Sequence, residues 1–466
     1  MPLEWLHQTI VIVMSLLLKI NAQGNRMDLK KLGLHFLSCF VLLTLVACSD
    51  PDSSQANSMH LERAAAYQTQ GQYKAAIIEY KNAVKKSNGD LEVILQYAKM
   101  LNSLGHYDVA LSLLEQQKGQ KTEAYYVALV TTFIGMNKFL SAEAILRDNL
   151  SSNSNEIKLL EADIQLGLDE LKLAHELYDQ ILLNNKAENF ALLGKAKILA
   201  RKGEAGARAA IDLLEKVEQQ SEAYNKARIL IAGIHLSQDN LESAEAILSN
   251  LLSSLPNTDI IVPDRALVLE RLAYVLTRQG RTNEAYIYTK LLAEAFPGAS
   301  EVQDKYKKAV EKYKAKELGE AKKILLAILD EFPSYKKAAQ LLGIISYLQG
   351  ENEQASKYLS ESVDPEVANP MAKHIYAATN LKLNDPKKVL EILEPGIEKV
   401  TSAETLTLYG LAAISDGQYL EYIDETGTVA ELIRQPANRY LASTSDLVHS
   451  DGNTSAFALD PTAGSI

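Results

Sequence analysis

One pattern of residues recurs along the chain at a nearly constant interval of about 34 residues. Its first clear copy, "RAAAYQTQGQYKAAIIEYKNAV", spans residues 63–84. One period further on, six of the seven skeleton residues keep their chemical character. A period of this length indicates an array of stacked units rather than one closed core. The skeleton is Ala64, Tyr67, Gly71, Tyr73, Ala76, Tyr80 and Ala83, followed by Ala98, Leu101, Gly105, Tyr107, Ala110, Leu114 and Gln117.

The spacing within each copy predicts two helices. Small and large apolar residues lie three or four positions apart, which is the spacing of one face of an α-helix. Glycines such as Gly71 and Gly105 fall between two such stretches, where a sharp turn favours glycine. Pro297 and Pro333 follow the second stretch of a copy, and proline ends a helix. We therefore expect each copy to be a helix, a tight turn and a second helix.

A small residue of the second helix can be followed through nine copies. The steps between these residues stay close to the repeat length, except for a longer step from Ala244 to Ala285. The longer step contains "SSLPNTDIIVPD" (253–264), whose two prolines and polar residues indicate a linker and a sub-boundary. Weaker copies follow at 370–397 and 402–425. The nine residues are Ala76, Ala110, Ala142, Ala174, Ala210, Ala244, Ala285, Ala321 and Ala355.

These copies resemble the tetratricopeptide repeat, a helix–turn–helix of about 34 residues. The resemblance implies an all-α fold, namely a right-handed superhelical solenoid of helix–turn–helix repeats. Repeats stack because one hairpin cannot bury its apolar face alone. It divides the chain into a first part of the array (59–252), the loop at 253–264, a second part (265–425) and a degenerate or truncated tail (426–466).

The N-terminus has a different composition from the array. Residues 32–47, "LGLHFLSCFVLLTLVA", form an apolar run that follows Lys30 and Lys31. The run is shorter than the roughly 20 residues of a transmembrane helix and is typical of a secretory signal. We expect a signal segment at 1–47 with the true start at Met27. The alternative is that the residues before Met27 form a second membrane-contacting segment.

The end of the apolar run resembles the lipobox of bacterial lipoproteins. The residues that carry the resemblance are Leu45, Val46, Ala47 and Cys48, followed at once by polar residues. In that family the cysteine thiol is acylated, the chain is cut before the cysteine, and the new amine is acylated too. The resemblance implies a cleavage signal at Leu45, Val46 and Ala47 and a lipid anchor on Cys48. The alternative is a chance cysteine after a short membrane helix.

The residues that follow Cys48 predict a tether and a location. Residues 48–58 are polar and lack periodicity, which is typical of a flexible tether. Ser49 stands where aspartate tends to keep lipoproteins on the inner membrane, so we expect an outer-membrane anchor facing the periplasm. Asp50 weakens this expectation. The opening of the mature chain is similar to that of the tetratricopeptide lipoproteins of PEP-CTERM/exosortase systems, which are linked to exopolysaccharide and biofilm export and are typically much longer.

Several classes of function are disfavoured. The formal net charge is −11, whereas nucleic-acid-binding proteins usually carry a basic stripe. The two cysteines, Cys39 and Cys48, both lie near the N-terminus, so the array has no thiol for a disulfide or a zinc site. His175 and Glu176 begin like a zinc-protease helix, but Asp179 stands where the second histidine belongs. We expect no catalysis, no cofactor, no metal and no nucleic-acid partner.

Two further features of the array are interpreted as structural. Gly194, Gly203 and Gly206 are interpreted as glycines of helix–helix turns rather than as a phosphate-binding loop. The segment 305–323 holds eight lysines against three glutamates. We interpret it as a solvated helix face, with a patch for an anionic polymer or for lipid head groups as the alternative.

The resemblances together imply a function. Tetratricopeptide arrays bind other proteins along a concave surface, and Tyr274 and Tyr347 fall at positions that often line it. Packing between repeats is the alternative role of these two tyrosines. We expect a non-catalytic periplasmic interaction scaffold that serves exopolysaccharide, biofilm or PEP-CTERM protein export. The alternatives are a pilus or secretion-pore assembly lipoprotein and a regulatory subunit of a cell-envelope enzyme.

Overall fold

A computed structural model gives the structure of the chain. It describes residues 52–416 apart from 88, 120, 152–153, 186–187, 296–297, 398–399 and 401. All secondary structure in these residues is helical, in the elements α3 to α23. None of these described helices is both long and apolar enough to cross a membrane. The expected signal segment, the lipobox with Cys48 and the tail at 426–466 lie outside the described residues.

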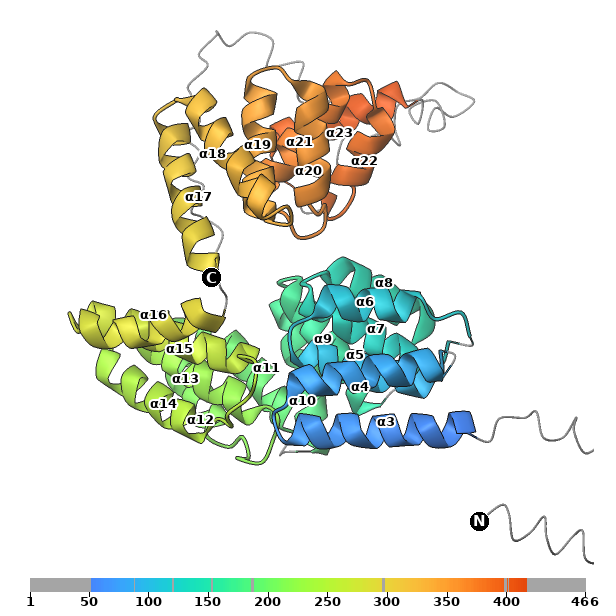
Figure 1. Ribbon diagram of the computed structural model, residues 1–466, viewed down its shortest axis with the longest axis vertical. Helices are drawn as coiled ribbons and strands as arrows, with labels where there is room; N and C mark the ends of the chain where they lie inside the picture. The colour runs from blue at the N-terminus through green and yellow to red at the C-terminus, as the bar shows by residue number, and fades with distance from the viewer. Residues whose placement is uncertain are drawn as a thin grey trace, which may run out of the picture.

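The first fourteen helices follow one another with short connections (Figure 1). Their bounds are α3 (Asp52–Thr69), α4 (Tyr73–Lys86), α5 (Leu91–Ser103), α6 (Tyr107–Glu115), α7 (Glu123–Gly135), α8 (Phe139–Asn149), α9 (Asn155–Gly167), α10 (Leu171–Asn184), α11 (Asn189–Ala200), α12 (Gly203–Leu214), α13 (Tyr224–Ser237), α14 (Leu241–Ser254), α15 (Pro263–Arg278) and α16 (Thr282–Ala295).

Seven more helices complete the array, and they form the upper part of Figure 1. Their bounds are α17 (Ala299–Lys314), α18 (Leu318–Glu331), α19 (Lys336–Leu348), α20 (Asn352–Ser362), α21 (Pro370–Lys382), α22 (Pro386–Leu393) and α23 (Ala403–Ser415).

The helices pack as successive hairpins. α3 packs on α4, α5 on α6, and the pairing continues to α21 and α22. All nine alanines of the sequence series lie in second helices, from Ala76 in α4 to Ala355 in α20, and each is at most 4% exposed. A larger side chain there would push the two helices of a hairpin apart. The repeat predicted from the sequence is therefore confirmed.

Side chains and turn residues fix where the helices begin and end. The side chains of Asp90, Thr122 and Ser154 each accept a hydrogen bond from a backbone N–H in the first turn of α5, α7 or α9. Such caps satisfy N–H groups that have no partner within the helix. The turn between α3 and α4 contains Gly71 at φ +72°, and Asp239 takes a similar conformation at φ +59° between α13 and α14. Aspartate tolerates this left-handed region better than most residues do, so the turn does not require glycine.

The first helices of the hairpins lie on the concave side of the array. α5 packs on α7, α7 on α9, α9 on α11, α11 on α13 and α13 on α15, whereas the second helices of consecutive hairpins lie farther apart. In a curved stack, the elements on the shorter arc approach one another most closely. We call the solvent-facing sides of α5, α7, α9, α11, α13 and α15 the inner surface.

The expected sub-boundary at 253–264 does not interrupt the packing. Only its residues 255–262 are non-helical, the two helices α14 and α15 pack on each other, and Leu255 belongs to the core that they share. The weak junction comes one hairpin later. Among the described residues, no core cluster joins α16 to α17, and α16 buries only Ala285 well. The array thus consists of a first part (α3–α16) and a second part (α17–α23).

The expected tether is partly helical. α3 begins at Asp52, inside the segment 48–58 that we predicted to lack structure. An acidic residue in the first turn favours a helix through the helix dipole. Ser, Gln and Ala at the following positions carry no penalty that would stop it. Polar composition alone is therefore a poor marker of where the array begins.

Two loops of the array contact hairpins far away in the sequence. In the first crossing contact, the carboxylate of Asp259 accepts hydrogen bonds from the backbone N–H groups of Tyr73 (2.8 Å) and Lys74 (3.1 Å) at the start of α4. In the second, the carboxylate of Glu366 accepts from the N–H of Ser141 (2.9 Å) in α8. The loops thereby reach back across 186 and 225 residues of the chain, and the solenoid closes on itself.

Candidate functional site

Charged side chains gather on the inner surface of three consecutive hairpins. Asp163 of α9, Lys197 of α11 and Lys226 of α13 interact electrostatically, and both lysines are exposed. Arg201, also exposed, repels Lys197 from the end of α11. A single carboxylate thus faces two lysines, while Arg201 is paired with Asp169. The arrangement presents net positive charge on the concave side of a chain that is acidic as a whole.

The position of Asp163 depends on a buried tyrosine from the second helix of its hairpin. The Tyr178 hydroxyl donates a hydrogen bond to Oδ1 of Asp163 at 2.5 Å, and Tyr178 is fully buried. A Cβ atom on Gly194 of α11 would lie 2.2 Å from Cζ of Tyr178. Gly194 therefore provides the space that this ring occupies. It lies inside a helix, so the prediction that it belongs to a turn is wrong, and its role is close packing.

Crowding by protein shifts the pKa values of the cluster. Desolvation raises the pKa of Asp163 above its usual value, although the bond from Tyr178 and the charges of Lys197 and Lys226 oppose the shift. Desolvation also lowers the pKa of Lys197, assisted by Lys226 and Arg201 and opposed by Asp163. A concave surface has this effect because its groups reach solvent while protein surrounds them on most sides. A ligand of opposite charge would replace the missing solvation.

Arginines at the ends of first helices tie consecutive hairpins together beside this cluster. Arg201 contacts Asp169 at 2.6 Å, and Arg278 contacts Asp239 at 2.9 Å. In both pairs the aspartate is the left-handed turn residue of the preceding hairpin. The aspartate therefore shapes a turn and also pairs with the next hairpin. These pairs are largely exposed, and such pairs contribute little to stability.

The two tyrosines predicted to line the groove have different environments. Tyr274 of α15 is 51% exposed, and its hydroxyl accepts a hydrogen bond from Arg278 at 2.9 Å. Tyr347 of α19 is half-buried against the core of the last hairpins. The Lys382 ammonium lies 4.1 Å from the centre of its ring, within the range of a cation–π contact. About half of Tyr274 is thus open to solvent, whereas Tyr347 also packs between repeats.

Four of the eight lysines of the segment 305–323 form ion pairs. Lys305 contacts both Glu301 (2.8 Å) and Glu331 (2.7 Å), and Lys312 contacts Glu317 (2.6 Å). Apolar residues of α17 belong to a core cluster with α18 and α19. These pairs agree with the interpretation of 305–323 as a solvated helix face.

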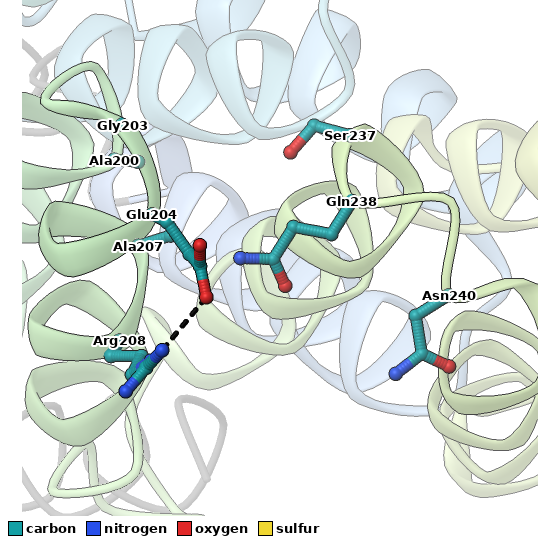
Figure 2. Close-up of a pocket in the computed structure, with 8 residues that line it drawn as sticks. All are labelled: Ala200, Gly203, Glu204, Ala207, Arg208, Ser237, Gln238 and Asn240. Carbon is teal, nitrogen blue, oxygen red and sulfur yellow. Dashed lines mark hydrogen bonds and ion pairs between the residues drawn. The ribbon is translucent and has the colours of Figure 1, made fainter.

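An open pocket lies between the start of α12 and the α13–α14 turn (Figure 2). Its volume is about 610 Å³. Glu204 and Arg208 line one side and pair with each other at 2.7 Å, while Gln238 and Asn240 line the other. Both members of the pair are three-quarters exposed. The charges on this side neutralise each other, so the pocket offers no convergent set of groups for a small ligand.

The described residues hold no cluster of histidine, cysteine and carboxylate side chains that could bind a metal ion. His175 of α10 instead pairs with Asp179 at 3.1 Å, one helical turn away. The predicted lipidation and cleavage residues, Leu45 to Cys48, lie outside the described residues, so their roles stay predictions. The charged cluster was not predicted from the sequence, although Asp163, Lys197 and Lys226 follow one another at intervals near the repeat length.

Comparisons with known proteins agree with the hairpin architecture. The model of the family described as tetratricopeptide repeat matches residues 207–261, which contain α13 and α14. No curated protein matches the chain.

Three solved structures are similar to this chain. A tetratricopeptide repeat protein from Parabacteroides merdae ATCC 43184 is 16% identical, with 70% of this chain and 99% of that chain covered and a TM-score of 0.30. A thermophilic TPR protein from Thermus thermophilus is 18% identical, with 45% and 93% covered and a TM-score of 0.30. The APC/C hetero-tetramer Cut9–Hcn1 gives 14% identity, 86% and 81% coverage and a TM-score of 0.26.

The fold is therefore an all-α solenoid of tetratricopeptide helix–turn–helix repeats. Consecutive hairpins with buried second-helix alanines extend the pattern on both sides of the matched segment. This fold is consistent with a scaffold for protein–protein interaction.

Proposed function

We propose that the chain is a non-catalytic scaffold that holds a protein partner on its inner surface. The observation that carries the proposal is the cluster of Asp163, Lys197 and Lys226, contributed by three successive first helices. Two exposed lysines facing one carboxylate favour an acidic segment of a partner. Tyr274 adds an exposed aromatic ring two helices further along, and aromatic residues are enriched at interfaces.

We further propose that a lipid on Cys48 anchors this scaffold in the outer membrane, facing the periplasm. The lipobox-like residues and the polar residues after them support the proposal. Two or more acyl chains hold a protein stably at a membrane without a spanning helix. By its resemblance to exosortase-associated lipoproteins, the scaffold would serve exopolysaccharide, biofilm or PEP-CTERM protein export. Pilus genes beside this gene would instead favour the assembly of a pilus or secretion pore, and regulation of a cell-envelope enzyme is the alternative of another class.

The partner is tested by crosslinking and recovery from native membranes. The double variant Lys197→Glu/Lys226→Glu is expected to lower recovery of an acidic partner about tenfold, equivalent to about 1.4 kcal/mol. Lys172→Glu is the matched control, because this exposed lysine lies on the second helix α10. Equal recovery of the partner with both variants would mean that the inner surface takes no part in the interaction.

The anchor is tested separately by metabolic labelling with a radioactive fatty acid. The native chain is expected to be labelled and to sediment with outer membranes, whereas Cys48→Ser is expected to be neither labelled nor processed. Labelling of the Cys48→Ser chain would contradict the anchor and would leave the interaction proposal standing.

A further inference from the structure

The first and second parts of the array meet at a junction without a shared core. In the rest of the array each second helix packs on the next first helix, as α14 does on α15 and α18 on α19. The described residues of α16 and α17 show no such packing, and Tyr286 of α16 is 65% exposed, whereas Ile77 and Leu111 at the matching positions of α4 and α6 pack against a core. The junction therefore contributes little to holding the two parts in place.

The second crossing contact joins the two parts elsewhere. Besides the bond from the Ser141 N–H, Glu366 accepts a bond from the Ser141 hydroxyl at 2.5 Å. The Lys138 ammonium contacts Asp364 at 2.7 Å. Asp364 and Glu366 lie in the loop between α20 and α21, and Lys138 and Ser141 lie at the start of α8. The charge of Lys373 also faces both carboxylates.

The interactions that define the second crossing contact are all polar. The side chains of Lys138 and Asp364 are 22% and 32% exposed, so water reaches the pair. The first crossing contact differs, because Ile260 and Val262 of its loop pack into the core of the first hairpins. Pairs of exposed charges weaken with salt, whereas apolar packing does not.

We propose that the second crossing contact is a reversible latch between the two parts of the array. With the latch closed, the loop between α20 and α21 holds the second part against the start of α8. With the latch open, the second part (α17–α23) turns about the junction after α16, and the gap between successive superhelical turns widens. The first crossing contact keeps the first part closed in both states. The latch thereby controls how far a partner reaches between the turns.

The latch is tested by distance measurements between two spin labels on the full-length chain. Cysteines replace Asp148 in α8 and Glu361 in α20, both exposed, in a chain that carries Cys39→Ser and Cys48→Ser. At about 0.05 M salt we expect one short-distance population. At about 1 M salt, where the screening length falls to about 3 Å, we expect a second, longer-distance population.

Three variants separate the latch from general damage to the fold. Asp364→Asn/Glu366→Ala is expected to populate the longer distance at both salt concentrations, while Glu204→Gln, which removes an ion pair within α12, is expected to match the native chain. The charge exchange Lys138→Glu/Asp364→Lys forms the ion pair with its charges reversed and is expected to give the short distance at low salt, as the native chain does. A misfolded chain would not give this distance. Identical distance distributions for the native chain and for Asp364→Asn/Glu366→Ala at both salt concentrations would overturn the proposal.

Discussion

The two crossing contacts perform the same task with different chemistry. In both, a carboxylate from an inter-hairpin loop binds N–H groups at the start of a second helix, α4 or α8. Neither Gln72 nor Lys138 caps its helix with its own side chain, so the distant carboxylate supplies the cap. The first contact adds two apolar side chains and a close backbone approach. The second adds one ion pair.

The difference indicates how strongly each closure is built. Asp259 donates its N–H to the Gly71 carbonyl at 3.0 Å, and a Cβ on Gly71 would lie 2.8 Å from the carbonyl oxygen of Asn257. A closely packed contact of this kind does not loosen through small displacements of the loop. The second contact rests on partly exposed polar groups and one ion pair, and ion pairs that water reaches contribute little to stability. We therefore expect substitutions to have larger effects at the first contact than at the second.

The largest effect is expected from Gly71→Ala. A non-glycine residue at φ +72° costs about 1–2 kcal/mol, and the added methyl group would also displace the loop that carries Asn257 and Thr258. We expect a total loss of about 2–4 kcal/mol in the free energy of unfolding measured with urea. Gly280→Ala is the control, because Gly280 has φ +78° with no atom within 4 Å of an added Cβ. Equal losses for the two variants would show that the first contact does not form in solution.

A smaller effect is expected from Asp259→Ala. It removes the cap of α4 and its favourable interaction with the helix dipole, which together contribute about 1–2 kcal/mol. Thermal unfolding followed by circular dichroism measures the loss. Asp108→Asn changes an exposed acid in the first turn of α6 that takes part in no crossing contact. If that control loses as much stability as Asp259→Ala, the crossing bonds to Tyr73 and Lys74 contribute nothing.

Whether a feature could be predicted from the sequence depends on how far apart its interacting residues lie along the chain. The repeat period and the buried alanines of the second helices could be predicted because helical periodicity is local. The loop at 253–264 could be located by its prolines, but it was expected to mark a boundary. Its bonds to a hairpin 186 residues away leave no local signal. The loop closes the first part instead of dividing the array.

The candidate site was predictable in outline only. Periodicity places Tyr274 and Tyr347 on first helices, and the structure places them there. Gly194 was misplaced because a glycine signal is the same in a turn and in a close helix contact. The bond from Tyr178 to Asp163 depends on that close contact. A pattern within one hairpin does not reveal it, because the space for the ring is provided by the next hairpin.

Asp364→Asn is expected to have a modest effect that depends on salt and pH. Partial burial alone would raise the pKa of Asp364, but the Lys138 ammonium and the Glu366 N–H lower it below its usual value of 3.8. A carboxylate whose pKa is lower in the folded state stabilises the fold above the unfolded value. This contribution is therefore fully present above pH 3.8 and is lost as the pH falls through the lower, folded value. We expect about 0.2–1 kcal/mol at neutral pH and low salt, measured by urea unfolding.

The control for Asp364→Asn is the same measurement at high salt. Screening is expected to bring the native chain and the variant to equal stability at about 1 M salt. A difference that persists there would mean that the ion pair with Lys138 is not what Asp364 contributes to stability.

The smallest effect is expected from Tyr286→Ser, and it tests whether α16 and α17 pack together. Tyr286 follows the second-helix alanine Ala285 and is 65% exposed, whereas Ile77 follows Ala76 and packs against the core of the first hairpins. Substitutions of exposed residues usually change stability by no more than about 0.5 kcal/mol, so we expect a loss within that range by urea unfolding. Ile77→Ser in α4 is the control and is expected to cost about 1–3 kcal/mol. Comparable losses would mean that α16 and α17 pack together in solution, and the second crossing contact would then close a continuous array rather than latch two parts.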